Sequence, residues 1–499
     1  MKFFKKTLKV LFVASEAGPF MKVGGLGEVM HSLPKALREQ GVDARVMVPR
    51  YATMDTDRFP LIMEREGLML ARPEEDPHGL FVSNVLRHDE GRQTVAYFLE
   101  NMEYYEKRAN VYGYADDAVR WALLSKGTLE FIRQSDWRPD VIVASDWQAG
   151  LIPNYLHTAY KEDRLLAGIA TVFSIHNLSY QGSFDHHFVS EMDYDSGSAP
   201  LPPLGDERFK KINFMRRGIR YADVINTVSP TYAKEITTPE YGELLDTLLR
   251  ERRSRLFGIL NGINRDSYDP ATDSRLETRY DIKTLSRRAE NKAALRRKFN
   301  LQNDAGIPLL GIVSRLTDQK GFGLLMDTAR PLLENFKFQL VVLGSGDSNF
   351  MSFFRDLAES YPERVAAHLT YDEALPSQIF GGADAILIPS RFEPSGLTQM
   401  EAMRYGAIPV VRKTGGLADS VLDYAPETQS GTGFVFEKFD HNAFFGTIVR
   451  VLETYRYPDA WKGIQRRAMA ADFSWLKSAE EYLRLFDQAI EFHTQSASQ

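Results

Sequence analysis

The sequence predicts an α/β protein with two Rossmann-like domains, each built on a doubly wound parallel sheet. Three observations lead to this fold class. The chain has 499 residues, which is long for a single hydrophobic core. Short, almost wholly apolar runs alternate with longer segments of helical periodicity, as expected for parallel strands that helices cover on both faces. This alternation stops at a stretch rich in turn residues and then begins again, which indicates two such domains.

Six apolar runs form the first series and are expected to be buried strands. They cover residues 9–15, 44–50, 93–99, 139–145, 169–176 and 222–229, with helical segments at 27–40 and 116–134 between them. The first run follows "MKFFKKTLK", which superficially resembles the start of a signal peptide. Lys9 leaves only residues 10–14 as an uninterrupted apolar stretch, too short for the hydrophobic region of such a peptide. We therefore expect a buried first strand.

The second series follows "NGINRDSYDPATD", whose turn residues indicate a domain boundary near residues 261–281. Its strands are expected at residues 308–315, 338–346, 383–390 and 407–412. Residues 475–492 have the apolar spacing of an amphipathic helix. The predicted division is therefore residues 1–262, residues 263–474 and a C-terminal helical segment, 475–499. Two stretches rich in Pro and Asp, residues 72–79 and 190–207, are expected to be mobile loops.

Composition narrows the class of protein. With 43% hydrophobic and 26% charged residues the chain is typical of globular proteins, and its net charge of −6 gives no basic footprint for nucleic acid. There is no cysteine, which excludes disulfides, thiolate metal sites and cysteine nucleophiles and fits a reducing cytoplasm. No run of about 18 apolar residues occurs, so no membrane span is expected.

The unusual polar clusters fall after predicted strands, where doubly wound sheets bind their ligands. The first is "KVGGLGEV" (residues 22–29), in which glycines precede a helix. Such glycines let backbone N–H groups approach an anion at the positive end of the helix dipole, but they also suit a simple tight turn. The spacing matches neither the nicotinamide-binding G-x-G-x-x-G nor a Walker A loop.

Two further clusters belong to the second series. Arg315 and Lys320 in "VSRLTDQKG" form a basic pair suited to a diphosphate leaving group, although a solvated surface pair has the same pattern. In "RFEPSGLTQ", Glu393 precedes a helix start expected at Ser395–Gly396. Gly415–Gly416, after the next strand, is a second turn compatible with an anion.

The last cluster is Asp146 and His176, at two strand ends of the first series. A lone histidine is more often structural than catalytic. The pair His186–His187 lacks the spacing of a metal site. The Asp-x-Asp triplets at residues 55–57 and 193–195 lie in turn-like stretches, so we expect no metal site.

Eight strings together resemble the bacterial glycogen synthase and plant starch synthase family, glycosyltransferase family 5. In the family's order they are "ASEAGPFMKVGGLGEV", "SDWQAGLIPNYL", "SIHNLSYQG", "NTVSPTYAKEI", "GILNGIN", "VSRLTDQKGF", "PSRFEPSGLTQMEAMRYGAIPVV" and "KTGGLADSV". The resemblance covers nearly the whole chain. It implies the GT-B fold, in which two Rossmann-like domains face a deep cleft and a C-terminal helix crosses back to the first domain.

The resemblance also implies an activity: retaining, metal-independent transfer of glucose from ADP-glucose to the non-reducing end of an α-1,4-glucan, with no cofactor. The second domain is then expected to carry the donor and the first domain the glucan. UDP-glucose as donor, a different acceptor, and a catalytically silent glucan-binding protein stay open as alternatives. A phosphorylase is disfavoured by the length of the chain.

The family's site residues carry over to positions that match its motifs. Four residues are expected at the reaction centre: Glu393 at the glucose, His176 hydrogen-bonded to the sugar, and Arg315 and Lys320 on the diphosphate. The expected donor site adds Lys22, Gly24, Gly25, Tyr371, Ser395, Gly396, Leu397 and Thr398, with the Tyr371 ring on the base. Glu16 and Asp146 are expected on the acceptor side.

Three motifs depart from the family's pattern. Ser395 stands where the family usually has cysteine, Val23 stands where it has threonine, and the common "HDWH" reads "SDWQ" at residues 145–148, with Ser145 and Gln148 in place of the two histidines. Serine keeps a small side chain next to Glu393, so we expect activity to be retained. Val23 removes one hydroxyl from the predicted donor site.

Overall fold

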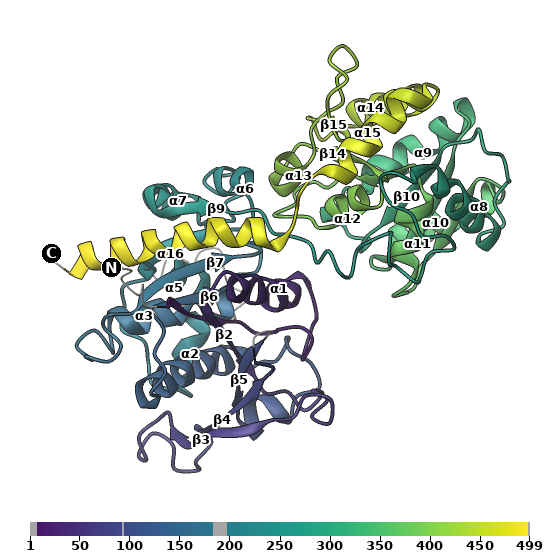
Figure 1. Cartoon of the computed structure of the whole chain (residues 1–499). Coiled ribbons are helices and arrows are strands. Elements are labelled where there is room, and N and C mark those ends of the chain that lie inside the picture. Colours follow the sequence, from purple (N-terminus) through teal and green to yellow (C-terminus); the bar gives the residue numbers. More distant parts are fainter. Residues whose placement is uncertain (1–6, 92–93, 183–196, 498–499) are drawn as a thin grey trace, which may run out of the picture. The chain divides into compact units, whose positions relative to one another are not determined.

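The computed structural model describes residues 7–91, 94–182 and 197–497 (Figure 1). The chain forms two compact units. The first comprises Met1–Val228, Ala233–Ile259 and Trp475–Gln499, and the second comprises Ser229–Tyr232 and Leu260–Ser474. The main division thus lies between Ile259 and Leu260, and the last segment of the chain returns to the first unit.

Within the described residues, the first unit contains a nine-stranded sheet with the order β3-β4-β5-β2-β1-β6-β7-β8-β9. Its strands are β1 (Lys9–Val13), β2 (Asp43–Pro49), β3 (Ile62–Met69), β4 (Val82–Asp89), β5 (Val95–Glu100), β6 (Val141–Ser145), β7 (Ala170–Ile175), β8 (Val224–Thr227) and β9 (Leu256–Gly258). All six apolar runs predicted as strands are strands, and the buried central ones pair in parallel.

The predicted parallel sheet is present, but antiparallel strands extend it at one edge. β3 and β4 form an antiparallel hairpin, and β4 is also antiparallel to β5. The side chains of β3 are mostly exposed, and its sequence "IMEREGLM" carries charges at three of eight positions. An edge strand of this kind lacks the continuous apolar run of a strand covered on both faces.

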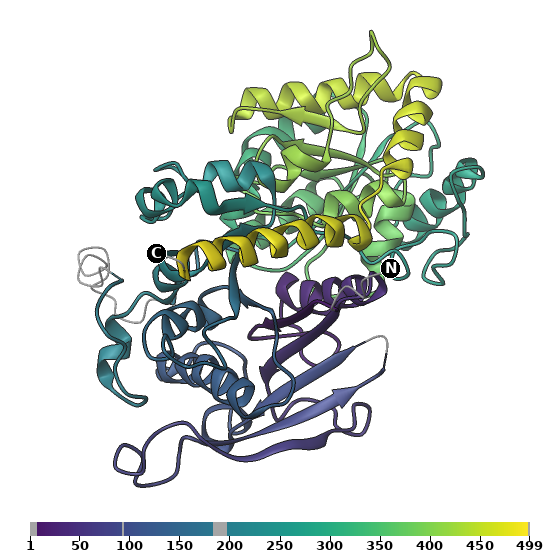
Figure 2. The same ribbon diagram turned by 60° about the vertical axis from the view of Figure 1, so that its left-hand side comes forward.

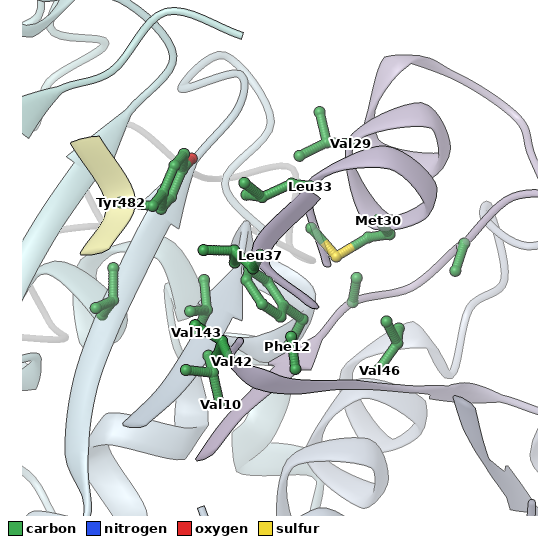
Figure 3. Packing of buried hydrophobic residues seen from close by; sticks show 14 of the residues in the cluster. Val10, Phe12, Val29, Met30, Leu33, Leu37, Val42, Val46, Val143 and Tyr482 are labelled. Carbon is green, nitrogen blue, oxygen red and sulfur yellow. The ribbon is translucent and has the colours of Figure 1, made fainter. Parts of the chain in front are cut away.

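Helices cover both faces of this sheet. They are α1 (Gly25–Glu39), α2 (Asp117–Gln134), α3 (Leu151–His157), α5 (Phe214–Tyr221), α7 (Asp246–Glu251) and α16 (Trp475–Ala497), with short helical turns at Met102–Glu106, Trp147–Ala149, Glu207–Lys211 and Arg253–Arg255. The division of the chain into units falls within α6 (Pro230–Glu235). The core between α1 and the sheet contains Phe12, Leu33 and Leu37 (Figure 3).

The C-terminal helix α16 packs against α1, β7 and β8 of the first unit (Figures 1 and 2). Tyr482 is buried in the same core as Phe12 and Leu33, and its hydroxyl accepts a hydrogen bond from the Asn226 side chain at 2.9 Å. Phe486 adds an edge-on ring contact with Phe12. The apolar stripe seen in the sequence is therefore the surface that attaches this helix to the first unit.

In the second unit, the described residues form a six-stranded parallel sheet with the order β12-β11-β10-β13-β14-β15. The strands are β10 (Leu309–Val313), β11 (Gln339–Leu343), β12 (Val365–His368), β13 (Ala385–Ile388), β14 (Ile408–Arg412) and β15 (Phe434–Phe436). The helices are α8 (Arg288–Lys298), α9 (Gly323–Asn335), α10 (Ser348–Ser360), α11 (Leu375–Gly382), α12 (Thr398–Arg404), α13 (Gly415–Ser420), α14 (His441–Tyr455) and α15 (Pro458–Ala470), with turns at Leu285–Arg287 and Asp318–Lys320.

Two apolar clusters line the two faces of this sheet, as the covered parallel strands predict. The sequence analysis located four of these strands but not β12 and β15, which are short strands at the two edges.

Several predicted features lie outside the described residues: the pair His186–His187, the triplet at residues 193–195 and the first part of the loop predicted at 190–207. Residues 72–79 form a turn-rich loop, as predicted. Asp55 in the other triplet accepts hydrogen bonds from the backbone N–H groups of Asp57 and Arg58, so it belongs to a turn. In the part of the chain that the structure describes, no helix is long and apolar enough to cross a membrane.

Candidate functional site

Each sheet has a topological switch point at which the strand order reverses, and the predicted site residues follow the strands beside it. In the first unit the reversal lies between β1 and β6, and Glu16, Asp146 and His176 follow β1, β6 and β7. In the second unit it lies between β10 and β13, which precede the loops of Lys320 and Glu393. Ligands of open α/β sheets bind at such points.

Asp146 occupies a strained turn directly after β6. Its φ of 53° lies in the left-handed region, which is uncommon for a residue with a side chain. Its Oδ1 accepts hydrogen bonds from the N–H groups of His176 (2.7 Å) and Asn177 (3.4 Å), which joins the end of β6 to the end of β7. The pKa of Asp146 is raised to about 7, mainly by burial and to a lesser extent by the charge of Glu16, although the two amides lower it.

The side chain of His176 is partly buried, and its Nε2 atom has no hydrogen-bond partner within the described residues. Burial lowers the pKa of His176 to about 4. The ring is therefore neutral near pH 7 and has a buried nitrogen available for a hydrogen bond. A structural histidine buried for packing would normally have that nitrogen satisfied.

Glu16 is buried and binds the glycine loop of its own unit. Its Oε2 accepts hydrogen bonds from the N–H groups of Val23 and Gly24, the latter at 3.0 Å. Burial raises the pKa of Glu16, and these amides partly offset that rise. The Gly24 amide, expected to meet an anion, is thus already engaged by a carboxylate. The predicted acceptor-side residue Glu16 is the residue that holds this loop.

Tyr112 is a member of this cluster that the sequence analysis missed. Its hydroxyl lies 2.8 Å from Ser15 Oγ, and both Glu16 and Asp146 interact with it electrostatically. Burial raises the pKa of Tyr112, so the phenol is neutral at ordinary pH. Tyr112 lies in a turn before α2, where no periodicity or motif singles out one tyrosine.

The glycine loop between β1 and α1 has space that the chain itself does not fill. A Cβ on Gly25 would meet nothing within 4 Å, and one on Gly24 would meet only Glu16, whereas one on Gly27 would press on Lys22 at 3.0 Å. Packing therefore disfavours a side chain at position 27 but not at positions 24 and 25. Lys22 Nζ donates to Glu28 at 2.8 Å, and although burial raises the pKa of Glu28, hydrogen bonds from Lys22 and Ser32 bring it below the ordinary value.

In the second unit, Lys320 and Glu393 form a direct ion pair. Lys320 Nζ lies 2.6 Å from Glu393 Oε2, and the side chains are 19% and 8% exposed. Ser390 donates to the same oxygen at 3.0 Å. Both donors thus fix one carboxylate oxygen, while Oε1 has no hydrogen bond among the described residues. The sequence analysis had placed these two residues on different parts of the donor, without foreseeing their contact.

Arg315 and Tyr371 are both solvent-exposed. The guanidinium of Arg315 forms no ion pair or hydrogen bond with the residues that the structure describes. The Tyr371 side chain follows β12 and is 86% exposed, which leaves its ring free to stack on a planar group. Neither residue is required by the packing of this unit.

Polar side chains hold the loop from Glu393 to α12 by donating hydrogen bonds to its backbone carbonyl groups. Gln399 is fully buried, and its Nε2 donates to Gly396 O at 2.8 Å and to Ser395 O at 3.2 Å. Ser229 Oγ donates to Pro394 O at 2.8 Å. The sequence analysis did not identify these two supporting residues, because nothing in an isolated glutamine or serine indicates which carbonyl it will meet.

The helix start expected at Ser395–Gly396 was wrong, because α12 begins at Thr398. Gly396 has a φ of +65°, and a Cβ there would lie 2.6 Å from Gln399 Oε1, so this position needs glycine. The backbone N–H groups of Gly396, Leu397 and Thr398 donate to no acceptor within the described residues. The Ser395 hydroxyl is likewise buried without a partner there.

Gly415–Gly416 does not form a second open turn, contrary to expectation. A Cβ on Gly415 would collide with the carbonyl oxygen of Glu393, and one on Gly416 with that of Ser395. The Gly416 amide donates to Glu393 O and Pro394 O at 3.1 Å each. Both positions are glycine because they pack against the backbone of the Glu393 loop. We therefore assign this pair the structural role of supporting that loop.

Within residues 7–91, 94–182 and 197–497, no three His, Asp or Glu side chains are grouped as a metal site requires. Around Glu393, the described residues offer the Lys320–Glu393 pair and the free backbone amides of residues 396–398, and the loop after β10 adds the unpaired Arg315.

Comparisons with known proteins match a glycosyltransferase family description to each of the two units. The sequence profile of the starch synthase catalytic domain matches residues 9–251, and that of glycosyl transferases group 1 matches residues 294–467. The chain is 41% identical to a glycogen synthase of Desulforudis audaxviator over 503 residues, covering 98% of both chains. It is also 41% identical to a glycogen synthase of Geobacillus stearothermophilus, covering 98% of this chain and 99% of the relative.

Solved structures give the same result. The catalytic domain of starch synthase IV from Arabidopsis thaliana, bound to ADP and acarbose, is 32% identical with a TM-score of 0.83, covering 97% of this chain and 100% of that one. A sucrose-phosphate synthase from Thermosynechococcus elongatus, 15% identical with a TM-score of 0.58 and coverage of 96% and 98%, shares the fold alone. The resemblance and the GT-B fold class predicted from the sequence are therefore confirmed: this chain is a glycosyltransferase that belongs to the glycogen and starch synthase family.

Proposed function

We propose that this protein is a glycogen synthase that transfers glucose from ADP-glucose to the non-reducing end of an α-1,4-glucan, with retention of the anomeric configuration. The observation that carries the proposal is the Lys320–Glu393 pair, together with the unpaired Arg315 on the same loop as Lys320 and the free amides of residues 396–398. These groups suit a reaction in which a diphosphate leaves from a glucosyl group. The ADP named for the starch synthase structure supports an adenine nucleotide as the donor.

Cleavage of the donor's anomeric C–O bond makes the glucosyl centre positive and the diphosphate more negative. Arg315, Lys320 and the amides of residues 396–398 are the groups proposed to stabilise the leaving diphosphate, because preorganised donors stabilise charge as it develops. Glu393 Oε1 is proposed to face the glucosyl group, since Oε2 is already held by Lys320 and Ser390. The exposed ring of Tyr371 suits stacking on the base.

The first unit is proposed to hold the glucan. His176, neutral with an unpaired Nε2, suits a hydrogen bond to a sugar hydroxyl near the reaction centre. Asp146 has a pKa near 7 and follows β6 at the switch point, which suits a hydrogen bond with an acceptor hydroxyl. The open space at Gly24 and Gly25 suits close approach by the donor.

The decisive experiment incubates the protein with a glucan and either ADP-glucose or UDP-glucose and follows release of the nucleoside diphosphate. We expect turnover with ADP-glucose to exceed that with UDP-glucose, and chain extension to be detected in the glucan. Activity in EDTA should match activity without it, because the proposed charge stabilisation needs no metal. Absence of turnover with both donors would refute the synthase proposal, and preference for UDP-glucose would refute the choice of base.

A further inference from the structure

A basic cavity lies at the opposite edge of the first unit's sheet from Glu16, Asp146 and His176. It has a volume of about 380 Å³ and is lined by Arg220, Arg252 and Arg255, together with His157, Tyr221 and Ser254. Arg220 lies in the last turn of α5, before β8, and Arg255 immediately precedes β9, so the cavity lies at the amino ends of these parallel strands. It is therefore separate from the residues at the carboxyl ends.

The three guanidinium groups form no ion pair with a carboxylate among the described residues. Arg252 donates to the carbonyl oxygens of Arg220 (2.7 Å) and Ala222, and its Nε is buried without a partner. Arg255 donates to Asp223 O at 3.2 Å and lies 4.5 Å over the ring of Phe492. The guanidinium of exposed Arg220 makes no hydrogen bond with the described residues.

The acidic groups near the cavity do not neutralise it. Asp223 is buried and its carboxylate already accepts from Thr171 at 2.8 and 2.9 Å and lies 3.2 Å from His493 of α16. Glu251 is exposed at the rim. The pKa of Arg252 is lowered to about 10, mainly by burial and also by the neighbouring charges of Arg255 and Arg220, although the charge of Asp223 raises it. The three neighbouring guanidinium groups therefore have no carboxylate paired with them among the described residues, and an anionic ligand would supply the missing negative charge.

We propose that this cavity binds a small phosphorylated metabolite through its phosphate group. Arginine guanidinium groups match phosphate oxygens in geometry and charge, and three converge here with unused N–H donors. The volume lies near the lower end of the range of about 300–1,000 Å³ for small-molecule pockets, which fits a ligand no larger than a sugar phosphate. His493 and Phe492 tie α16 to the same cluster, so ligand binding stabilises the end of α16.

Hydrogen–deuterium exchange of the full chain, titrated with inorganic pyrophosphate at constant ionic strength, tests the proposal. Peptides covering residues 214–221, 246–258 and 485–497 report this cavity separately from the Lys320 region. We expect saturable protection in all three. Arg220→Gln removes a guanidinium that makes no internal hydrogen bond, so we expect the apparent Kd to rise at least about tenfold with the fold intact.

Arg253→Gln is the matched control, because Arg253 lies in the helical turn Arg253–Arg255 next to the cavity, is exposed and does not line the cavity. Its Kd should stay within about twofold of the wild-type value. Ser254→Asp places a negative charge at the cavity and should abolish the protection of the three peptides by pyrophosphate. The proposal is overturned if pyrophosphate protects none of the three peptides, if the Arg220 and Arg253 variants bind alike, or if citrate protects as strongly as pyrophosphate.

Discussion

The ion pair between Lys320 and Glu393 makes a quantitative prediction about the stability of the second unit. The two charged atoms are 2.6 Å apart, and the side chains are only 19% and 8% exposed. Lys320→Met leaves the Glu393 carboxylate with Ser390 as its one hydrogen-bond donor among the described residues. Removing one partner of a buried pair costs about 3–5 kcal/mol, and the residual exposure of Lys320 sets our expectation at about 3 kcal/mol.

The double variant Lys320→Met/Glu393→Gln should recover much of this loss, because it leaves no buried charge. We expect it to be at least about 1.5 kcal/mol more stable than the sum of the two single variants. Lys413→Met is the matched control: Lys413 pairs with Glu437 at 2.7 Å in the same unit, but the side chains are 57% and 74% exposed. We expect no measurable effect there, since solvent screens such pairs.

Native-state hydrogen exchange resolved to peptides of β10 and β13 is the suitable assay, because a chain of two units need not unfold in one step. It should be run together with turnover measurements, in which each single variant is expected to lose at least about 10²-fold in kcat. Additivity of the two substitutions within about 0.5 kcal/mol would refute the pairing argument. So would an equal loss of stability in the Lys413 variant.

Three further predictions concern single positions. Asp146 has a folded pKa near 7 against an ordinary value of 3.8, so its contribution to stability is full below about pH 3.8 and is lost as pH rises through about 7. Asp146→Asn should therefore gain stability over the wild type as pH rises, to a limit of about 4 kcal/mol, measured by exchange in β6 at pH 5 and 8. Arg315→Gln should leave hydrogen exchange unchanged, because the guanidinium has no partner among the described residues, and should lower kcat/KM at least about 10²-fold. Gly25→Ala should fold normally, since a Cβ meets nothing within 4 Å, but should raise the KM for the donor; an unchanged KM would remove this loop from the donor site.

The strands that carry the site were predictable from the sequence, because strands covered on both faces must be continuously apolar. Residues 9–15 and 308–315 are clear examples, and β1 and β10 lie within them. The edge strand β3 was missed for the converse reason: its exposed, charged residues bear no burial constraint. A strand of three residues, such as β15, is too short for its sequence to show the apolar pattern of a strand.

Contacts between loops could not be predicted in the same way. Lys320 and Glu393 are 73 positions apart, and their contact depends on β10 and β13 being neighbours in the sheet. The strand order is a property of the whole fold, and no local pattern encodes it. The same limit applies to Gly416, whose amide meets the Glu393 carbonyl, and to Gln399, whose position on α12 gives no sign of the carbonyls that it binds.

The pairing of Lys320 also changes how charge is shared in the proposed mechanism. Lys320 and Glu393 together carry no net charge, so of the residues predicted to hold the diphosphate in the second unit, Arg315 is the one that brings an uncompensated positive charge. An ammonium group has three N–H donors, and Glu393 occupies one of them. Lys320 can therefore donate to a phosphate oxygen without leaving Glu393, which would couple the position of the carboxylate to that of the leaving group. We infer that Arg315 supplies the larger share of electrostatic stabilisation, whereas Lys320 mainly fixes Glu393 relative to the diphosphate.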